Sequence, residues 1–123
     1  MSVSIMKQGA TLVVALQEAL ADFEWRRFQQ DLLQRARKDG IRGVIVDLSG
    51  MDIVDSFASR MINDLVRMLG LEGSEVVIIG IQPEVAFAMA RLGLRLEEVP
   101  TALDFDEGTA LLKARLKERR NHA

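Results

Sequence analysis

The serine and carboxylate side chains between Asp47 and Arg60 are the ones whose types and spacing could do chemistry. Their stretch reads Asp-Leu-Ser-Gly-Met-Asp-Ile-Val-Asp-Ser-Phe-Ala-Ser-Arg and overlaps the apolar, β-branched run Val44–Leu48. Such a run is typical of a strand buried on both faces, and open α/β sheets carry their sites at the carboxyl ends of these strands. Ser56 is expected at the start of the next helix, where its hydroxyl could cap the helix or accept a phosphate.

These two interpretations of Ser56 predict different charges on the surface around it. As an N-cap, Ser56 would only satisfy a backbone N–H of the first helical turn. As a phosphoacceptor it would gain about −1.5 to −2 charges at pH 7, which a helix N-terminus tolerates. Because Asp52 and Asp55 lie close in sequence, the added charge would change a protruding surface without unfolding the domain. Ser59 is a weaker second candidate acceptor, and is otherwise expected to be an ordinary helix-surface serine.

The acidic residues of the same stretch allow a second kind of chemistry. Asp47, Asp52 and Asp55 could bind a hard cation such as Mg²⁺, or could serve as turn carboxylates and helix caps. A receiver-type aspartate site would need an adjacent acidic pair after the first strand, and Glu18 and Asp22 are not adjacent. The sequence therefore favours turns and caps, and neither a metal nor a cofactor is expected.

The composition removes most classes of enzyme. The 123 residues include no Cys and a single His, His122, next to the C-terminus. Thiol catalysis, histidine base catalysis and Cys- or His-rich metal sites are therefore not expected. Ser56 lacks the flanking glycines of a nucleophile elbow, and neither a dinucleotide-binding glycine motif nor a P-loop is present. The chain is expected not to be an enzyme, although a weak nucleotide contact at the loops stays open.

The order of the predicted elements indicates an α/β fold. Strands alternate with helices, so the sheet of four to five strands should be mixed but mostly parallel, with an antiparallel hairpin at its N-terminal end. Asp22 and Asp104 are the candidate N-caps of the first and last helices. The expected strands are Val3–Met6, Thr11–Leu16, Val44–Leu48, Glu75–Gly80 and a candidate edge strand at Leu94–Val99. The expected helices are one that follows its cap Asp22 and ends near Lys38, then Ser56–Leu69, Pro83–Leu92 and a last one after Asp104.

The chain is expected to form one domain over residues 1–116, followed by a flexible basic tail at 117–123. The run Lys113–Arg120 holds five basic residues and one acid, which suits the C-terminal end of a helix. A net charge of −2 gives no general attraction to nucleic acid. No apolar run approaches the ~20 residues of a membrane span, and the N-terminus lacks a signal-peptide pattern. A cytoplasmic protein is therefore expected.

Several segments resemble the STAS family of anti-sigma-factor antagonists. They read Val-Asp-Ser-Phe-Ala-Ser-Arg (54–60), Gly-Ile-Gln-Pro-Glu-Val-Ala (80–86), Arg-Leu-Gly-Leu (91–94) and Glu-Glu-Val-Pro-Thr-Ala-Leu-Asp (97–104). The likeness runs from about Val3 to Leu116 in element order, and the RsbS type of stressosome scaffold is the most similar type. The resemblance implies a STAS fold in which the helices lie mainly on one face of the sheet.

The resemblance also implies a function for Ser56 as the phosphoserine of a binding switch. The unmodified chain would sequester an RsbT-type serine kinase, and phosphorylation by that kinase would release it to activate a downstream partner. RsbR-type STAS proteins would join the chain in a large assembly, and a homodimer or homo-oligomer is expected. The alternative is a free antagonist that binds an anti-sigma-factor kinase in a simple partner-switching pair. Phe57 and Ala58 stand where many such antagonists have Ser and Gly.

A kinase-binding face around Ser56 is expected to include the preceding loop and exposed positions of the helix. Its residues are Met51, Asp52, Asp55, Ser56, Arg60 and Asn63.

Overall fold

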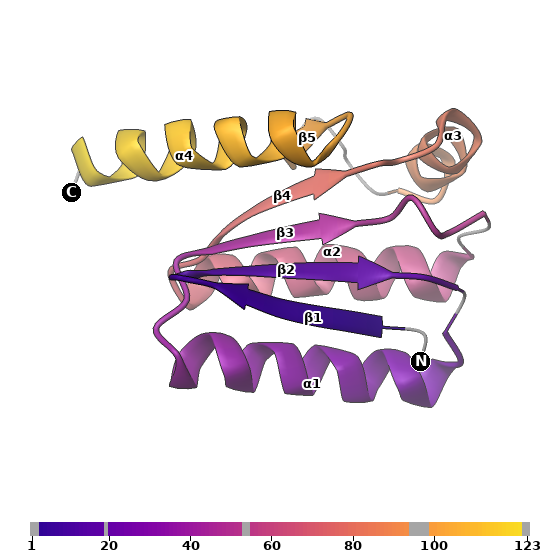
Figure 1. The fold of residues 1–123 in the computed structure, drawn as a ribbon. Coiled ribbons are helices and arrows are strands. Elements are labelled where there is room, and N and C mark those ends of the chain that lie inside the picture. The colour runs from indigo at the N-terminus through magenta and orange to yellow at the C-terminus, as the bar shows by residue number, and fades with distance from the viewer. Residues whose placement is uncertain (1–2, 19, 53–54, 94–98, 122–123) are drawn as a thin grey trace.

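The computed structural model describes residues 3–18, 20–52, 55–93 and 99–121 of the chain. These residues form five strands and four helices (Figure 1). In chain order the elements are β1 (Val3–Gln8), β2 (Thr11–Leu16), α1 (Asp22–Lys38), β3 (Gly43–Asp47), α2 (Ser56–Leu71), β4 (Glu75–Ile79), α3 (Pro83–Arg91), β5 (Thr101–Ala102) and α4 (Phe105–Asn121).

The strands form one mixed sheet in the order β1-β2-β3-β4-β5. β1 and β2 pair antiparallel, whereas β2, β3, β4 and β5 pair parallel. Parallel strands inside a sheet are covered on both faces, which explains why Val44, Ile45 and Val46 of β3 are all buried. The predicted mostly parallel sheet with an N-terminal hairpin is confirmed.

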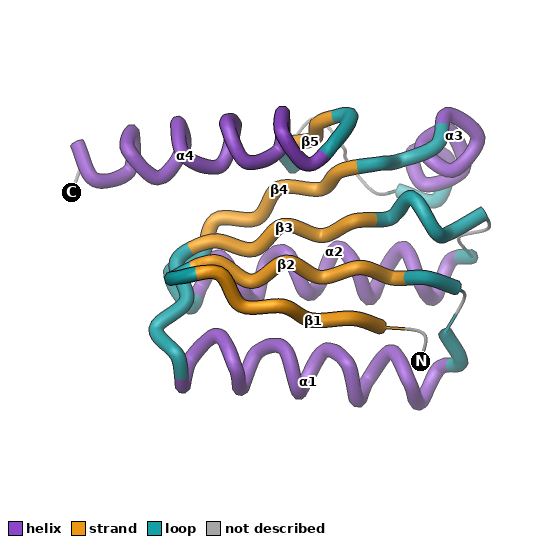
Figure 2. The backbone as a smooth tube through the Cα atoms, in the orientation of Figure 1, coloured by secondary structure: helices purple, strands orange, loops and turns teal. Residues whose placement is uncertain are grey.

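The helices cover the two faces of the sheet unequally (Figure 2). α1, α2 and α3 supply residues such as Leu32 and Met89 to the main apolar core. Successive residues of a strand point to opposite faces, and Ile45 and Val77 form a second cluster with Leu112 of α4. The helices therefore lie mainly on one face, as predicted, and α4 covers the other. No helix among the described residues is both long and apolar enough to cross a membrane.

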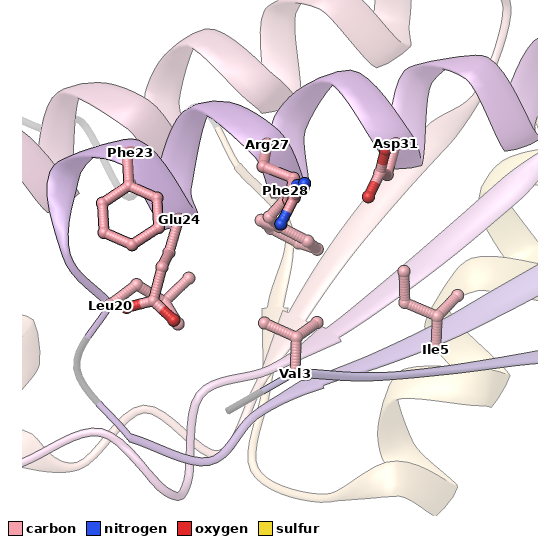
Figure 3. Close-up of a pocket in the computed structure, with 8 residues that line it drawn as sticks. All are labelled: Val3, Ile5, Leu20, Phe23, Glu24, Arg27, Phe28 and Asp31. Atoms are coloured by element: carbon pink, nitrogen blue, oxygen red, sulfur yellow. The ribbon is translucent and has the colours of Figure 1, made fainter. Parts of the chain in front are cut away.

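A groove of about 340 Å³ lies between β1 and α1 (Figure 3). Val3 and Ile5 project from β1 into this groove, and Phe28 lines it from α1 (Figure 3). Both strand residues pack against the main apolar core, to which Phe28 belongs. The hairpin is therefore held to α1 by apolar contact, although Phe23 at the start of the helix stays 70% exposed.

The first helix begins one residue earlier than predicted. Ala21 is its N-cap and Asp22 is the first helical residue, so the expectation that Asp22 caps the helix is wrong. The Glu24 carboxylate accepts a hydrogen bond from Ala21 N at 2.9 Å. This bond satisfies the backbone at the cap from inside the first turn, which explains why Asp22 is not needed there. The predicted end of the helix at Lys38 is confirmed.

A short edge strand, β5, pairs with β4 after α3. Residues 94–98 of the expected strand Leu94–Val99 lie outside the described residues, and β5 comprises Thr101 and Ala102. Ile78 N donates to Pro100 O at 2.9 Å. Since proline has no N–H to give to the ladder, pairing with β4 continues from the residue after it.

The last helix extends into the segment expected to be a tail. Asp104 caps it, as predicted, since Asp104 Oδ1 accepts from Glu107 N at 2.9 Å. The helix then continues past residue 116 to Asn121. Arg119 Nη1 donates to Gly73 O at 3.2 Å and lies 3.6 Å from a Glu75 carboxylate oxygen. Residues 117–121 are therefore part of α4, and Arg119 ties this end of the helix to the start of β4.

An ion pair joins the end of α1 to the end of α2. Arg37 Nη2 lies 2.6 Å from Glu72 Oε1, and Arg37 Nε donates to Glu72 Oε2 at 3.4 Å. The hydrogen bond from Arg37 lowers the pKa of the Glu72 carboxyl below its ordinary value of 4.5, although desolvation opposes this shift. A carboxyl whose pKa is lowered by folding contributes stability above its unfolded pKa, and this contribution is lost as pH falls through the folded pKa.

The Glu72→Gln substitution is therefore expected to lower the melting temperature at about pH 7 and to have less effect at about pH 3, where Glu72 is protonated. The effect should be small because the pair is exposed to solvent. Thermal unfolding of both proteins at both pH values measures it. Glu118→Gln, which removes an exposed carboxyl of α4, is the control. Equal pH dependence of Glu72→Gln and the wild type would contradict the prediction.

Candidate functional site

The loop that follows β3 stands at the carboxyl edge of the sheet and is stabilised by short-range hydrogen bonds. Asp47 Oδ1 accepts from Ser49 N at 2.9 Å, and Met51 N donates to Leu48 O at 3.0 Å. The Met51 side chain is 1% exposed and belongs to the main apolar core. Met51 therefore anchors the loop from inside, and the expectation that its side chain lies on a partner-binding surface is wrong.

Ser56 is exposed and is the first residue of α2. The N-cap is Asp55, whose Oδ1 accepts from Ala58 N at 2.8 Å. The interpretation of Ser56 as the cap is therefore wrong, because the neighbouring carboxylate occupies that position. Since Ser56 does not supply the cap bond, its hydroxyl can change chemically without loss of that bond.

The Asp55→Ala substitution is expected to lower the free energy of unfolding by about 1 kcal/mol, the usual cost of losing an N-cap side chain. Chemical denaturation followed by circular dichroism measures this change. Asp64→Ala is the matched control, because it removes an exposed carboxylate of the same helix that caps nothing. A loss of stability in Asp64→Ala as large as in Asp55→Ala would contradict the cap assignment.

Gln82 connects the loop before α3 to the loop before α2. Its Nε2 donates to Ser49 O at 3.1 Å and lies 3.3 Å from Asp52 Oδ1. The exposed Asp52 carboxylate is therefore held by a side chain thirty residues away in sequence. Sequence reasoning singled out the segment Gly-Ile-Gln-Pro but gave Gln82 no role. A polar residue just after the neighbouring parallel strand was the signal available.

Gly80 lets the same two loops approach each other. Its φ is +72°, and a Cβ built on it would lie 2.8 Å from Asp47 Oδ1 and 2.9 Å from Ser49 Cβ. Only glycine satisfies both the left-handed backbone and this close approach. The position of the Asp52 loop therefore depends on Gly80 as well as on Gln82.

The exposed side of α2 continues the surface that Ser56 begins. Arg60 is exposed and Asn63 is half-buried. Arg60 follows Ser56 by four residues and Asn63 follows Arg60 by three, which places all of them on one side of the helix. Arg26 of α1 lies over the Phe57 ring, with its guanidinium carbon 5.6 Å from the ring centroid. Sequence reasoning did not connect Arg26 with this site, because the contact crosses between two helices.

Ser59 does not lie on the helix surface. It is 3% exposed, and its Oγ has no hydrogen-bond partner among the described residues. The expectation of a surface serine is wrong because α2 is buried over a wider arc than its apolar residues indicate, and this arc includes Ser59 beside Ile62. A kinase could reach Ser59 only if the helix moved, so the geometry favours Ser56 as the acceptor.

The carboxylates of the loop are engaged in local hydrogen bonds. Asp47 accepts from the turn, Asp52 from Gln82 and Asp55 from the first turn of α2. Within residues 3–18, 20–52, 55–93 and 99–121, no group of three or more His, Asp or Glu side chains is placed to hold a metal ion. The role as turn carboxylates and caps agrees with the bonds that these residues make.

Solved structures with the same architecture include proteins of the stressosome. The chain matches a serine-to-glutamate variant of RsbS from Moorella thermoacetica with a TM-score of 0.85 at 31% identity, over 95% of this chain and 99% of that one. It matches a chain in a structure of the stressosome, described as a signal integration and transduction hub, with a TM-score of 0.78 at 29% identity, over 92% and 98% of the two chains.

Curated proteins of Bacillus subtilis (strain 168) are similar in sequence. The RsbT co-antagonist protein RsbRA is 28% identical over 83 residues, which are 68% of this chain and 30% of that protein. The chain therefore spans about a third of the length of that relative. A family model described as "STAS domain" matches residues 2–108. Together with the five-stranded mixed sheet and its N-terminal hairpin, this match shows that the chain belongs to the STAS domain family.

Proposed function

We propose that the chain is a scaffold controlled by phosphorylation of Ser56 in a cytoplasmic, stressosome-type assembly. The observation that carries the proposal is the position of Ser56, exposed at the first residue of α2 while Asp55 supplies the cap. A group can therefore be added to the Ser56 hydroxyl without breaking the hydrogen bond that starts the helix. The chain acts by binding rather than by catalysis.

The partner of the unmodified surface is a serine kinase of the RsbT type. The similar RsbRA is described as an RsbT co-antagonist, and the similar RsbS and stressosome structures cover nearly the whole chain. The kinase docks on the side formed by Asp52, Asp55, Ser56, Arg60 and Asn63, and RsbR-type STAS proteins form the rest of the assembly.

Phosphorylation releases the kinase through charge and desolvation. The kinase transfers the γ-phosphoryl group of ATP to Ser56 Oγ, the hydroxyl proton leaves, and ADP is the second product. The new dianion directly follows the Asp55 carboxylate, and Asp52 lies four residues before it in sequence. It therefore raises the negative charge of a surface that the docked kinase must cover. The Moorella RsbS of the similar structure carries glutamate in place of a serine, a change that imitates such a charge.

Phosphopeptide mass spectrometry after incubation with an RsbT-type kinase and Mg-ATP tests the proposal. The expected result is one phosphate on Ser56 in the wild type and in Ser59→Ala, and none in Ser56→Ala. A phosphate on Ser59, or undiminished phosphorylation of Ser56→Ala, would overturn the assignment.

Light scattering with an RsbR-type partner separates the scaffold from the alternative, a free antagonist that pairs with an anti-sigma-factor kinase. Particles far larger than a pair of chains support the scaffold. A simple one-to-one complex with the kinase, and no assembly with the RsbR-type protein, supports the free antagonist.

A further inference from the structure

A hollow of about 510 Å³ lies beside the C-terminal end of α4, where the ends of α1 and α2 and the turn before β3 meet. Ala36 and Ile41, both buried, and the half-buried Leu116 give it an apolar floor. Four guanidinium side chains from three parts of the chain surround this floor. They are Arg37, Arg42, Arg119 and Arg120.

The hollow carries more positive charge than its own contacts neutralise. Arg37 is paired with Glu72, the acidic residue of the lining. Arg119 is engaged with the carboxylate of Glu75, which lies outside the hollow. Arg42 and Arg120 make no ion pair with any described residue, so two cations remain available to an acidic ligand.

The opposite end of α4 carries an exposed turn with the complementary character. This turn consists of Leu103 and Asp104, which join β5 to α4, and of the first three residues of α4, 105–107 (Figure 1). Leu103 is 79% exposed and Phe105 is 40% exposed. The turn is held from within, because Leu103 N donates to Glu107 Oε2 at 3.2 Å. Asp106 is exposed and makes no ion pair with any described residue. Acidic first turns and basic last turns are common in helices. That preference does not explain why two apolar side chains are exposed at one end of α4 while an apolar floor lies at the other end.

We propose that the hollow binds the 103–107 turn of a second copy of this chain. Leu103 of the second copy would cover the apolar floor, and Asp106 of the second copy would meet Arg42 and Arg120. The turn and the hollow lie at opposite ends of α4, which has 17 residues and is therefore about 25 Å long. The second copy must therefore be turned as well as displaced relative to the first for its turn to reach the hollow. Such a contact is heterologous, so each chain keeps one free turn and one free hollow, and association continues unless a ring closes.

Sedimentation velocity measures this association directly. For the wild type the average mass is expected to rise with protein concentration at about 0.01 M salt and to fall at about 1 M salt, because the Debye length shortens from about 30 Å to about 3 Å. A wild type that stays monomeric at every concentration in low salt would overturn the proposal. It would do so even if inorganic phosphate were found to bind in the hollow.

Two complementary variants test the geometry. The hollow variant carries Arg42→Glu with Arg120→Glu, and the turn variant carries Leu103→Lys with Asp106→Lys; all four side chains are exposed, so the fold should persist and circular dichroism checks it. Each variant alone is expected to be monomeric. A mixture is expected to associate, because the intact turn of the hollow variant fits the intact hollow of the turn variant. A mixture that stays monomeric would overturn the proposal.

Matched variants control for net charge. Arg67→Glu with Arg91→Glu, and Phe87→Lys with Asp64→Lys, make the same charge changes at exposed positions away from both surfaces. They are expected to associate like the wild type. If they lost association as fully as the hollow and turn variants do, only overall charge would matter and the proposed contact would be wrong. The contact goes beyond the proposed function and does not involve Ser56, so Ser56→Ala should leave the mass unchanged whether or not Ser56 is the phosphoacceptor.

Discussion

Replacing Ser56 by aspartate is expected to weaken the binding of an RsbT-type serine kinase by about 5- to 150-fold, the range of a typical coupling between a switch and its partner. The new carboxylate stands at the first residue of α2, directly after the exposed Asp55 that caps the helix. It places a further negative charge on the surface that the kinase must desolvate, and aspartate carries less charge than phosphoserine. Isothermal titration calorimetry of kinase against both proteins gives the ratio of Kd values.

Two variants separate the effect of position from that of charge. Ser56→Ala removes the hydroxyl without adding charge and is expected to bind the kinase like the wild type, or to hold it longer in the presence of ATP. Ser4→Asp makes the same substitution at an exposed serine of β1, far along the chain from α2. Equal affinities of Ser56→Asp and Ser4→Asp would end the idea that Ser56 is the switch.

The Gly80→Ala substitution is expected to lower the free energy of unfolding by about 2–5 kcal/mol. A left-handed backbone costs a non-glycine residue about 1–2 kcal/mol, and forcing a methyl group into a filled space costs about 1–3 kcal/mol more. At Gly80 φ is +72°, and the methyl group would meet Asp47 Oδ1 and Ser49. Urea denaturation measures the loss, and kinase affinity should fall as well because the Asp52 loop must move.

Gly73→Ala separates the two contributions. Gly73 also has a positive φ, +91°, but nothing lies within 4 Å of its Cβ position. This variant should therefore show only the backbone cost of about 1–2 kcal/mol and should leave kinase binding unchanged. If Gly73→Ala and Gly80→Ala were equally destabilised, close packing between the two loops would not be the cause.

The elements that sequence periodicity defines best are those that the structure confirms. Trp25, Phe28, Leu32 and Ala36 recur at helical spacing and are all buried on one side of α1. Each amphipathic helix and each apolar strand carries its own signal, because the core face repeats every 3.6 or every two residues. The order of the elements then leaves few topologies, since parallel crossovers are right-handed.

Residues near the site were harder to place, because their surroundings come from distant parts of the chain. Asp55 and Ser56 are both good N-caps, so sequence alone cannot say which of two neighbours starts the helix. Ser59 is polar and was expected on the surface, yet packing buries it. Met51 follows a turn and was expected outside, yet its side chain fills the core beneath the loop.

By itself, the sequence determined the fold class, the hairpin and parallel sheet, and the segment that carries Ser56, because local periodicity and turn residues are properties of neighbouring positions. Only the tertiary structure decided that Asp55 caps α2 and leaves Ser56 exposed, that Gln82 and Gly80 position the Asp52 loop, and that α4 continues to Asn121. These features depend on contacts between strands and helices far apart in the chain, and burial and hydrogen bonding there are settled by packing rather than by the local choice of residue.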